Sequence, residues 1–350
     1  MPRPTRLLPL FLLLIVPALL LACSDDDEGD DVGAATTAPA DEATPSPTQA
    51  PEPDSVIFMA GFKPQANLPF VGAYVAKEMG FFEEENLDVE IRHSNPGENF
   101  RFLASGEVQF STADASALLE KWTGDPQLSV VSIALVGQTG QQGFAVLADS
   151  GIETPEDWPG KTAGYKGGSV TPDYLAILEA LGIDRSSIEE VKVGFEPQLL
   201  TEGVVDIFPV FIANEPDTLQ RLGFETNVFT AADYGAPTLG LSYIAMEDYI
   251  ADNPGVTERF VRAALKGIQW ADENRDAALD IVMEYAPQED RDHQAYMMET
   301  ELEMAKVGEY EAMGLGGQTI DQWQALHDFL IAHEGLPAPV EDLTRVFWTP

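Results

Sequence analysis

Short apolar runs and helical patterns alternate along the chain from about residue 55 onward. Residues 55–61 and 87–94 predict two strands, and the second shows strict alternation of Leu87, Val89 and Ile91. Residues 67–86 have apolar side chains at helical spacing and predict a helix that is ended by Gly80. Further strands are predicted at residues 108–114, 128–137, 143–149, 162–165, 188–195, 204–212 and 239–246. Strands that alternate with helices in this way predict an α/β fold.

The C-terminal region is predicted to be almost wholly helical. In residues 255–274, Phe260, Val261 and Ala264 fall on one helix face. Further helical patterns cover residues 289–313 and 318–334. The body from about residue 56 to 350 is long enough for one large domain or two lobes.

The first 23 residues do not belong to this pattern. Arg3 and Arg6 precede an apolar segment of sixteen residues, which is too short for a comfortable membrane-spanning helix. The segment closes on Leu20-Leu21-Ala22-Cys23, which resembles the lipobox of bacterial lipoproteins. The alternative is an uncleaved signal anchor with a buried cysteine. Cys23 is the only cysteine, so an intrachain disulfide is impossible, and we predict that residues 1–23 are a signal peptide with lipidation at Cys23.

Residues 24–54 predict a disordered tether between that anchor and the body. They are rich in Asp, Pro, Thr and Ala and have almost no large apolar side chain, so they cannot bury enough surface to offset their ordering entropy. Neither Lys nor Arg occurs between Arg6 and Lys63, so anionic headgroups should repel the tether. We therefore expect an extracytoplasmic body anchored to the cell membrane by a lipid.

Charge and motifs exclude several classes of function. The formal net charge of −40 makes nucleic acid an improbable partner. The chain contains no G-x-S-x-G, G-x-x-x-x-G-K-[ST] or H-E-x-x-H motif, and its four histidines are too widely spaced to suggest a metal site. We therefore expect no metal, no cofactor and no catalysis.

One stretch of the body resembles the first βαβ unit of a large family of ABC-importer solute-binding proteins, which bind nitrate, sulfonates or the pyrimidine precursor of thiamine. The stretch reads Ala73-Tyr74-Val75-Ala76-Lys77-Glu78-Met79-Gly80-Phe81-Phe82, then Asn86-Leu87-Asp88-Val89. Further matches lie at residues 103–115, 151–165, 204–224 and 233–237. Within the family the chain looks most like the branch that binds the thiamine pyrimidine precursor, which has riboflavin-binding relatives.

The loop after the first strand departs from that branch. Relatives that bind the pyrimidine often carry an aspartate-aromatic pair and a histidine there. Residues 61–69 of this chain are about two residues longer and contain no histidine. The departure leaves the identity of the ligand open.

The resemblance implies a two-lobed periplasmic-binding-protein fold of type II with two crossing segments. Lobe 1 is expected at residues 55–146 and 240–350, and lobe 2 at residues 147–239. The strand at 143–149 should carry the chain out of lobe 1, and the strand at 239–246 should bring it back. The ligand is expected between the lobes, the protein should be a monomer, and its partner should be an ABC permease.

Candidate ligand-binding residues lie in loops at strand ends, because ligands of open α/β sheets bind beyond the carboxyl ends of strands. They are Phe62, Asn67, Thr112, Asp114, Gln141, Tyr165, Lys166, Ser169, Phe211, Asn214, Glu215 and Tyr234. Each has a structural alternative. Asp114 is also a possible helix N-cap, the glycine-rich loop near Ser169 is a possible cap through Thr171, and the aromatic residues could belong to the core.

The residues Asn214 and Glu215 illustrate the choice. They follow the predicted strand at 204–212 and precede Pro216. In the structural interpretation Asn214 is an N-cap and Glu215 a first-turn acid. In the functional interpretation Glu215 accepts a hydrogen bond from the ligand and Asn214 exchanges hydrogen bonds with it.

We therefore expect capture of a small aromatic heterocycle, such as the thiamine pyrimidine precursor or riboflavin. Lys63 and Lys166 are the only strand-end lysines near the site, so a strongly anionic ligand such as a sulfonate or nitrate ranks lower. A ligand-sensing lipoprotein is a further alternative. An enzyme ranks last.

Overall fold

The computed structural model describes residues 52–350. The predicted signal peptide, the predicted lipidation at Cys23 and the predicted tether up to residue 51 lie outside the described residues. Among residues 52–350, no helix combines the length and the apolar character that crossing a bilayer requires.

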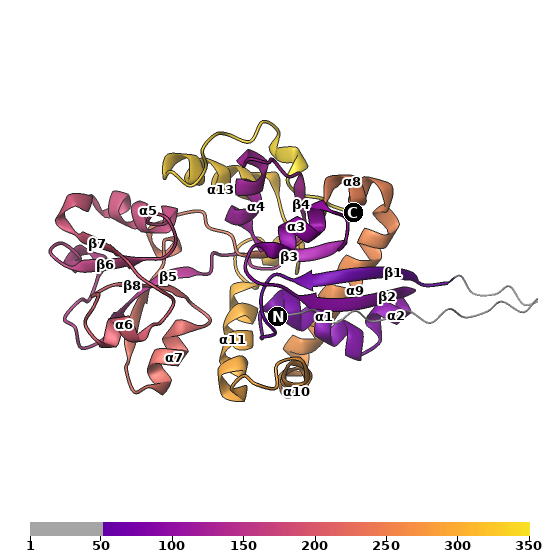
Figure 1. The fold of residues 1–350 in the computed structure, drawn as a ribbon, viewed down its shortest axis with the longest axis horizontal. Helices are drawn as coiled ribbons and strands as arrows, with labels where there is room; N and C mark the ends of the chain where they lie inside the picture. Colours follow the sequence, from indigo (N-terminus) through magenta and orange to yellow (C-terminus); the bar gives the residue numbers. More distant parts are fainter. Residues whose placement is uncertain (1–51) are drawn as a thin grey trace, which may run out of the picture. The chain divides into compact units, whose positions relative to one another are not determined.

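Lobe 1 (residues 52–136 and 241–350) is built on a five-stranded sheet with the order β2-β1-β3-β10-β4 (Figure 1). The strands are β1 (Asp54–Ala60), β2 (Leu87–His93), β3 (Phe110–Asp114), β4 (Val130–Leu135) and β10 (Leu241–Met246). β1 runs parallel to β2 and β3, whereas β10 runs antiparallel to β3 and β4. The carboxyl ends of β1 and β3 therefore meet at one edge of the sheet.

Helices cover this sheet and make up the C-terminal region. They are α1 (Leu68–Glu78), α2 (Phe81–Glu84), α3 (Glu98–Ala104), α4 (Ala115–Thr123), α8 (Glu247–Asp252), α9 (Pro254–Glu273), α10 (Arg275–Tyr285), α11 (Arg291–Met304), α12 (Tyr310–Met313) and α13 (Ile320–Ala332), with a 3-10 turn at Leu343–Arg345. α1 and α9 cross closely because both carry glycine at the crossing. A Cβ atom on Gly267 would overlap the carbonyl oxygen of Gly72. Phe110 and Phe260 stack beneath, with ring centroids 4.0 Å apart.

Lobe 2 (residues 142–236) has a three-stranded sheet with the order β8-β5-β9 and a parallel pair, β6 and β7. Its strands are β5 (Gln142–Leu147), β6 (Thr162–Tyr165), β7 (Glu189–Lys192), β8 (Phe208–Phe211) and β9 (Thr226–Phe229). Its helices are α5 (Pro172–Leu181), α6 (Gln198–Thr201) and α7 (Glu215–Arg221), with 3-10 turns at Pro155–Asp157, Arg185–Ser187 and Ala232–Tyr234. Phe144, Trp158 and Tyr174 pack in a core separate from that of lobe 1.

Two expectations about lobe 2 differ from the structure. β5 pairs with β8 and β9, so the chain has left lobe 1 before Gln142, earlier than the expected boundary at residue 147. The run at 204–212 is not a strand throughout, because β8 begins only at Phe208 and Val204 is 50 % exposed in a bend that follows the turn at residues 202–203. Apolar composition alone does not show where a turn interrupts such a run. β9 was not predicted.

Candidate ligand-binding site

The ends of β1 and β3 carry the first group of candidate residues. Thr112 is buried, and its Oγ1 accepts a hydrogen bond from the backbone N–H of Gly61 at 3.2 Å. Asn99 donates to the Thr112 carbonyl at 2.9 Å. Phe62 follows Gly61 and has an exposed fraction of 36 %. Thr112 therefore holds the start of the loop in which Phe62 lies.

Asp114 ends β3 and caps α4, accepting a hydrogen bond from the backbone N–H of Ser116 at 2.9 Å. The predicted cap is confirmed. Burial raises the pKa of Asp114 to about 7, and the negative charge of Asp173 adds to this rise. Burial likewise raises the pKa of Asp173 to about 6. Since Asp173 belongs to α5 of lobe 2, two carboxyl groups from different lobes lie close enough to interact.

A second group surrounds the buried carboxylate of Glu301 on α11. Glu301 accepts hydrogen bonds from the backbone N–H of Leu68 at 2.6 Å and from Asn67 Nδ2 at 2.5 Å. Burial raises the pKa of Glu301 to about 7, while its polar contacts with Leu68, Asn67 and Gln141 act in the opposite direction. Asn67 and Gln141 thus both lie beside a residue that the sequence interpretation did not name.

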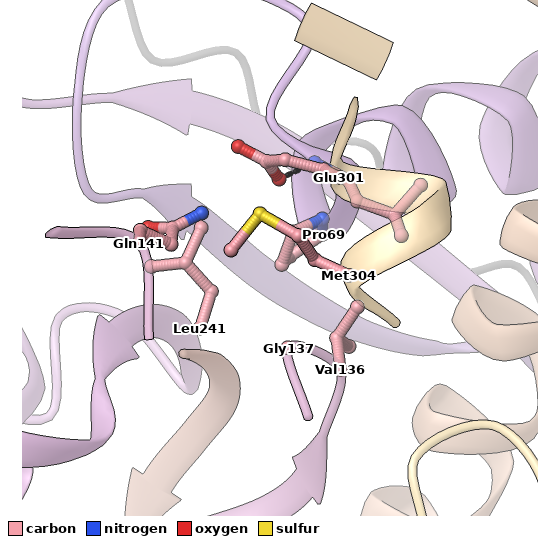
Figure 2. Close-up of a pocket in the computed structure, with 8 residues that line it drawn as sticks. Pro69, Val136, Gly137, Gln141, Leu241, Glu301 and Met304 are labelled. Atoms are coloured by element: carbon pink, nitrogen blue, oxygen red, sulfur yellow. Dashed lines mark hydrogen bonds between the residues drawn. The ribbon is translucent and has the colours of Figure 1, made fainter. Parts of the chain in front are cut away.

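Figure 2 shows the cavity beside this group. Leu68, Pro69, Val136, Gly137, Gln141, Leu241, Glu301 and Met304 line it. Its volume is about 10 Å³, which is room for one water molecule at most. A heterocyclic ring cannot fit there.

The third group joins Lys166, which follows β6, to Glu215 at the start of α7. Lys166 Nζ lies 2.7 Å from Glu215 Oε1, and Glu215 Oε2 accepts a hydrogen bond from the backbone N–H of Phe211 at 2.7 Å. Both oxygens of the Glu215 carboxylate, which is 4 % exposed, are therefore engaged within the protein.

Aromatic rings surround the ammonium group of Lys166. Its Nζ atom lies 4.9 Å from the ring centroid of Phe208, 5.2 Å from that of Phe195 and 5.7 Å from that of Phe211. Phe208 is buried, but Phe195 and Phe211 are 69 % and 38 % exposed. Two open aromatic faces thus lie beside an ion pair that is already neutral overall.

Asn214 occupies the N-cap position of α7, but its side chain makes no cap hydrogen bond, contrary to the structural interpretation. Its Oδ1 lies 2.9 Å from His293 Nε2, and His293 Nδ1 lies 2.6 Å from Asp217 Oδ2. Tyr296 donates to the carbonyl of Ile212 at 3.2 Å. His293 and Tyr296 belong to α11, so this helix contacts lobe 2 here.

The remaining candidates lie apart from these groups. Tyr165 ends β6 and is half-buried, and Ser169 is exposed in the loop before α5. Thr171 caps α5, as the structural alternative for this loop expected. Tyr234 packs against the core of lobe 2, which agrees with the structural alternative for the aromatic residues.

Sequence reasoning missed Glu301, Asp173 and His293. One signal was present, because α11 buries Gln294 and Glu301, seven residues apart, beside Met297 and Met298. Polar side chains on the apolar face of a helix have to find hydrogen-bond partners. No group of three or more side chains able to hold a metal ion occurs among residues 52–350.

Comparison with known families identifies the family of this chain. The family model described as NMT1/THI5 like matches residues 67–278, which is more than half of the chain. The chain belongs to the NMT1/THI5-like family. The family recognised from the sequence is thereby confirmed.

Two curated relatives of this NMT1/THI5-like protein cover most of its length. The formylaminopyrimidine-binding protein of Halalkalibacterium halodurans is 31 % identical over 82 % of this chain and 88 % of its own. The riboflavin-binding protein RibY of Chloroflexus aurantiacus is 28 % identical over 87 % of this chain and 88 % of its own. The relatives also include an enzyme, a 4-amino-5-hydroxymethyl-2-methylpyrimidine phosphate synthase of Legionella pneumophila, 27 % identical over 61 % of this chain and 69 % of its own.

Among solved structures, the periplasmic aliphatic sulphonate binding protein SsuA of Escherichia coli has the same fold. The TM-score is 0.64 at 15 % identity, over 86 % of this NMT1/THI5-like chain and 93 % of that one. The predicted α/β, periplasmic-binding-protein fold with a helical C-terminal region is thus confirmed.

Proposed function

We propose that this protein is the solute-binding component of an ABC importer and captures a small, flat heterocycle with N–H donors, in the class of vitamins and vitamin precursors. The names of two relatives that span most of the chain, a formylaminopyrimidine-binding and a riboflavin-binding protein, support this class. The ring binds between the lobes and outside the cavity in Figure 2, which is too small to hold it. Phe195 and Phe211 offer open aromatic faces for stacking.

The observation that carries the proposal is the balance of charge at the candidate site. Lys166 is paired with Glu215, and Lys63 is paired with Glu289 at 2.7 Å. Asp114 of lobe 1 and Asp173 of lobe 2 add two carboxyl groups that lie close enough to interact. A sulfonate or nitrate would need unpaired cations, whereas an amino heterocycle needs hydrogen-bond acceptors.

Isothermal titration calorimetry with an aminopyrimidine, riboflavin, taurine and nitrate tests the ligand class. We expect binding of an aminopyrimidine or a flavin and none of taurine or nitrate. Tight binding of taurine or nitrate without binding of either heterocycle would show the proposal to be wrong. Incubation with an aminopyrimidine and analysis of products tests for catalysis, because enzymes occur among the relatives; we expect no product.

The N-terminal segment and the partners complete the proposal. A lipid on Cys23 anchors the protein on the extracytoplasmic side, residues 24–54 act as the tether, and a monomer delivers the ligand to a membrane permease. Two-lobed binding proteins act by hinge closure around the ligand. Metabolic labelling with a fatty acid tests the anchor: the wild type should incorporate the label, and Cys23→Ser should not.

A further inference from the structure

Two of the four histidines lie where lobe 1 contacts lobe 2. The first is His293, near the start of α11 in lobe 1. Its Nδ1 lies 2.6 Å from Asp217 Oδ2, and its Nε2 lies 2.9 Å from Asn214 Oδ1. The side chains of His293 and Asp217 are 14 % and 11 % exposed. Both nitrogens of this ring therefore face oxygen atoms of lobe 2, at a contact that is largely shielded from water.

The second is His333, which follows the last residue of α13 in lobe 1. Its Nδ1 lies 2.9 Å from the carbonyl oxygen of Phe329, and its Nε2 lies 3.0 Å from Glu179 Oε2 on α5 of lobe 2. Ala176, also on α5, is buried among the core residues of lobe 1, so the lobes are packed together here. Each of these two histidines thus joins lobe 1 to a carboxylate of lobe 2.

The oxygen atoms that face the two rings show which protonation state fits. Carbonyl, amide and ionised carboxylate oxygens only accept hydrogen bonds, and a neutral imidazole has one N–H whereas the imidazolium has two. His293 and His333 therefore make both of their contacts only when they are protonated. His327 differs, because its Nδ1 lies 2.9 Å from Asp328 Oδ1 while its Nε2 accepts a hydrogen bond from the N–H of Val340 at 3.2 Å. The neutral ring satisfies both contacts of His327, and both lie within lobe 1.

Most of the charged groups around the two rings of the lobe contacts are acidic. Those near His293 are Asp217, Asp290, Asp292 and Arg221. Those near His333 are Glu179, Asp173, Glu334 and, beside Glu334, Arg185. Burial raises the pKa of Asp173 to about 6, whereas the charge of His333 acts in the opposite direction. A proton on either ring is thus attracted by more charges than repel it.

We propose that protonation holds the lobes together, because the imidazolium rings of His293 and His333 join lobe 1 to α7 and α5, and that these contacts weaken when the rings become neutral. Histidine is the side chain that ordinarily changes charge between about pH 5 and pH 8. Asp114 and Asp173 act in the same direction, since both are ionised, and repel each other across the lobes, only above about pH 7. The closed form is therefore favoured at acid pH. Its effect on ligand retention rests on the proposed function, but closure can be followed without a ligand.

Small-angle scattering of the full chain without ligand tests the closure. We expect the radius of gyration of the wild type to increase from pH 5.5 to pH 8. The double variant His293→Gln, His333→Gln cannot take up these two protons. It should already show the larger radius at pH 5.5 and keep less than half of the increase, the remainder coming from Asp114 and Asp173.

A second double variant and a matched control make this test independent of one set of substitutions. Asp217→Asn, Glu179→Gln removes the carboxylates in place of the histidines and should lose the pH dependence in the same way. His327→Gln is the control, because His327 also contacts a carboxylate, but one of its own lobe. This variant should keep the full increase. Far-UV circular dichroism identifies the variants that fold as the wild type does.

Calorimetry with riboflavin at the two pH values tests the effect on a ligand. Riboflavin is the probe because its ring system carries no group that titrates in this range. We expect the wild type to bind it roughly 3- to 10-fold more weakly at pH 8, the value of two partly exposed charged contacts. The double histidine variant should bind it with nearly the same affinity at both pH values.

The outcomes separate this inference from the proposed function. A wild-type radius that is independent of pH overturns the inference, as does an increase of which the double histidine variant keeps half or more. Equal affinity for riboflavin at both pH values supports the function and rejects the inference. If riboflavin does not bind, scattering alone decides the inference. If an aminopyrimidine does not bind either, the proposed function fails.

Discussion

Removal of the Glu215 carboxylate isolates the energetic role of the ion pair with Lys166. The side chains of Lys166 and Glu215 are 14 % and 5 % exposed, so water reaches neither freely. Glu215→Ala would leave the Lys166 ammonium without its partner and the N–H of Phe211 without its acceptor.

The expected cost follows from these contacts. Breaking a buried pair by deleting one partner costs about 3–5 kcal/mol. Cation–π attraction to the aromatic rings around Lys166 offsets roughly 0.5–1 kcal/mol of this cost, and the ammonium keeps some access to water. We therefore expect Glu215→Ala to lower the free energy of unfolding by about 3 kcal/mol. Glu215→Gln, which keeps an acceptor for Phe211, should cost about 1–2 kcal/mol.

Urea unfolding of Glu215→Gln, Lys166→Met and the double variant measures the coupling between the two side chains. The double variant should recover part of the loss, with a coupling energy of about 1–2 kcal/mol, because it contains no unpaired buried charge. Calorimetry on the same proteins separates stability from binding. If Glu215→Gln weakened ligand binding 10-fold or more while the unfolding free energy stayed unchanged, Glu215 would be a ligand acceptor and its structural role in the ion pair would be refuted.

Three further predictions concern titration, packing and the contact of α11 with lobe 2. Burial raises the pKa of Asp114 in the folded state to about 7, so the folded protein is more stable when Asp114 is protonated. This contribution to the free energy of unfolding is complete below the unfolded pKa near 4 and is lost as the pH rises through about 7. The urea concentration at the unfolding midpoint should thus decrease as the pH is raised from 5 to 8. The decrease should be smaller in Asp114→Asn, which keeps a capping side chain, and an equal decrease in both proteins would contradict this. Gly267→Ala should lower the free energy of unfolding by about 2 kcal/mol or more, since its Cβ would overlap Gly72. Gly255→Ala is the control and should have little effect, because a Cβ there meets open space. A melting temperature of Gly267→Ala equal to that of the wild type would refute the overlap. His293→Ala removes the contacts with Asp217 and Asn214, so small-angle scattering should show a larger radius of gyration, and an unchanged radius would speak against a restraint on the lobes.

Local patterns predicted most of the fold. Alternation and helical spacing placed the strands of lobe 1 and the helices α1, α9 and α13 close to their observed bounds. Caps were also visible, since Asp114 and Thr171 precede their helices in the expected way. These features depend on neighbouring residues, which the sequence places side by side.

The site was harder to predict because its partners are distant in the chain. Lys166 and Glu215 are 49 residues apart, and both were named as ligand contacts without being recognised as partners of each other. Asn67 and Glu301 are 234 residues apart, and no periodicity connects them. A single sequence shows which side chains are polar, but the pairing of buried polar groups is decided by tertiary packing.

Helix α11 has a mechanical consequence that follows from its position. Over fourteen residues, roughly 20 Å of rigid rod, it contacts α7 of lobe 2 through His293, the loop before α1 through Gln294 and Glu301, and Gln138 of the crossing segment through Met304. A one-residue insertion near its centre would rotate one half by about 100° relative to the other, so the two ends could no longer engage their partners together. The register of α11 therefore fixes the spacing between three segments that come from different parts of the chain.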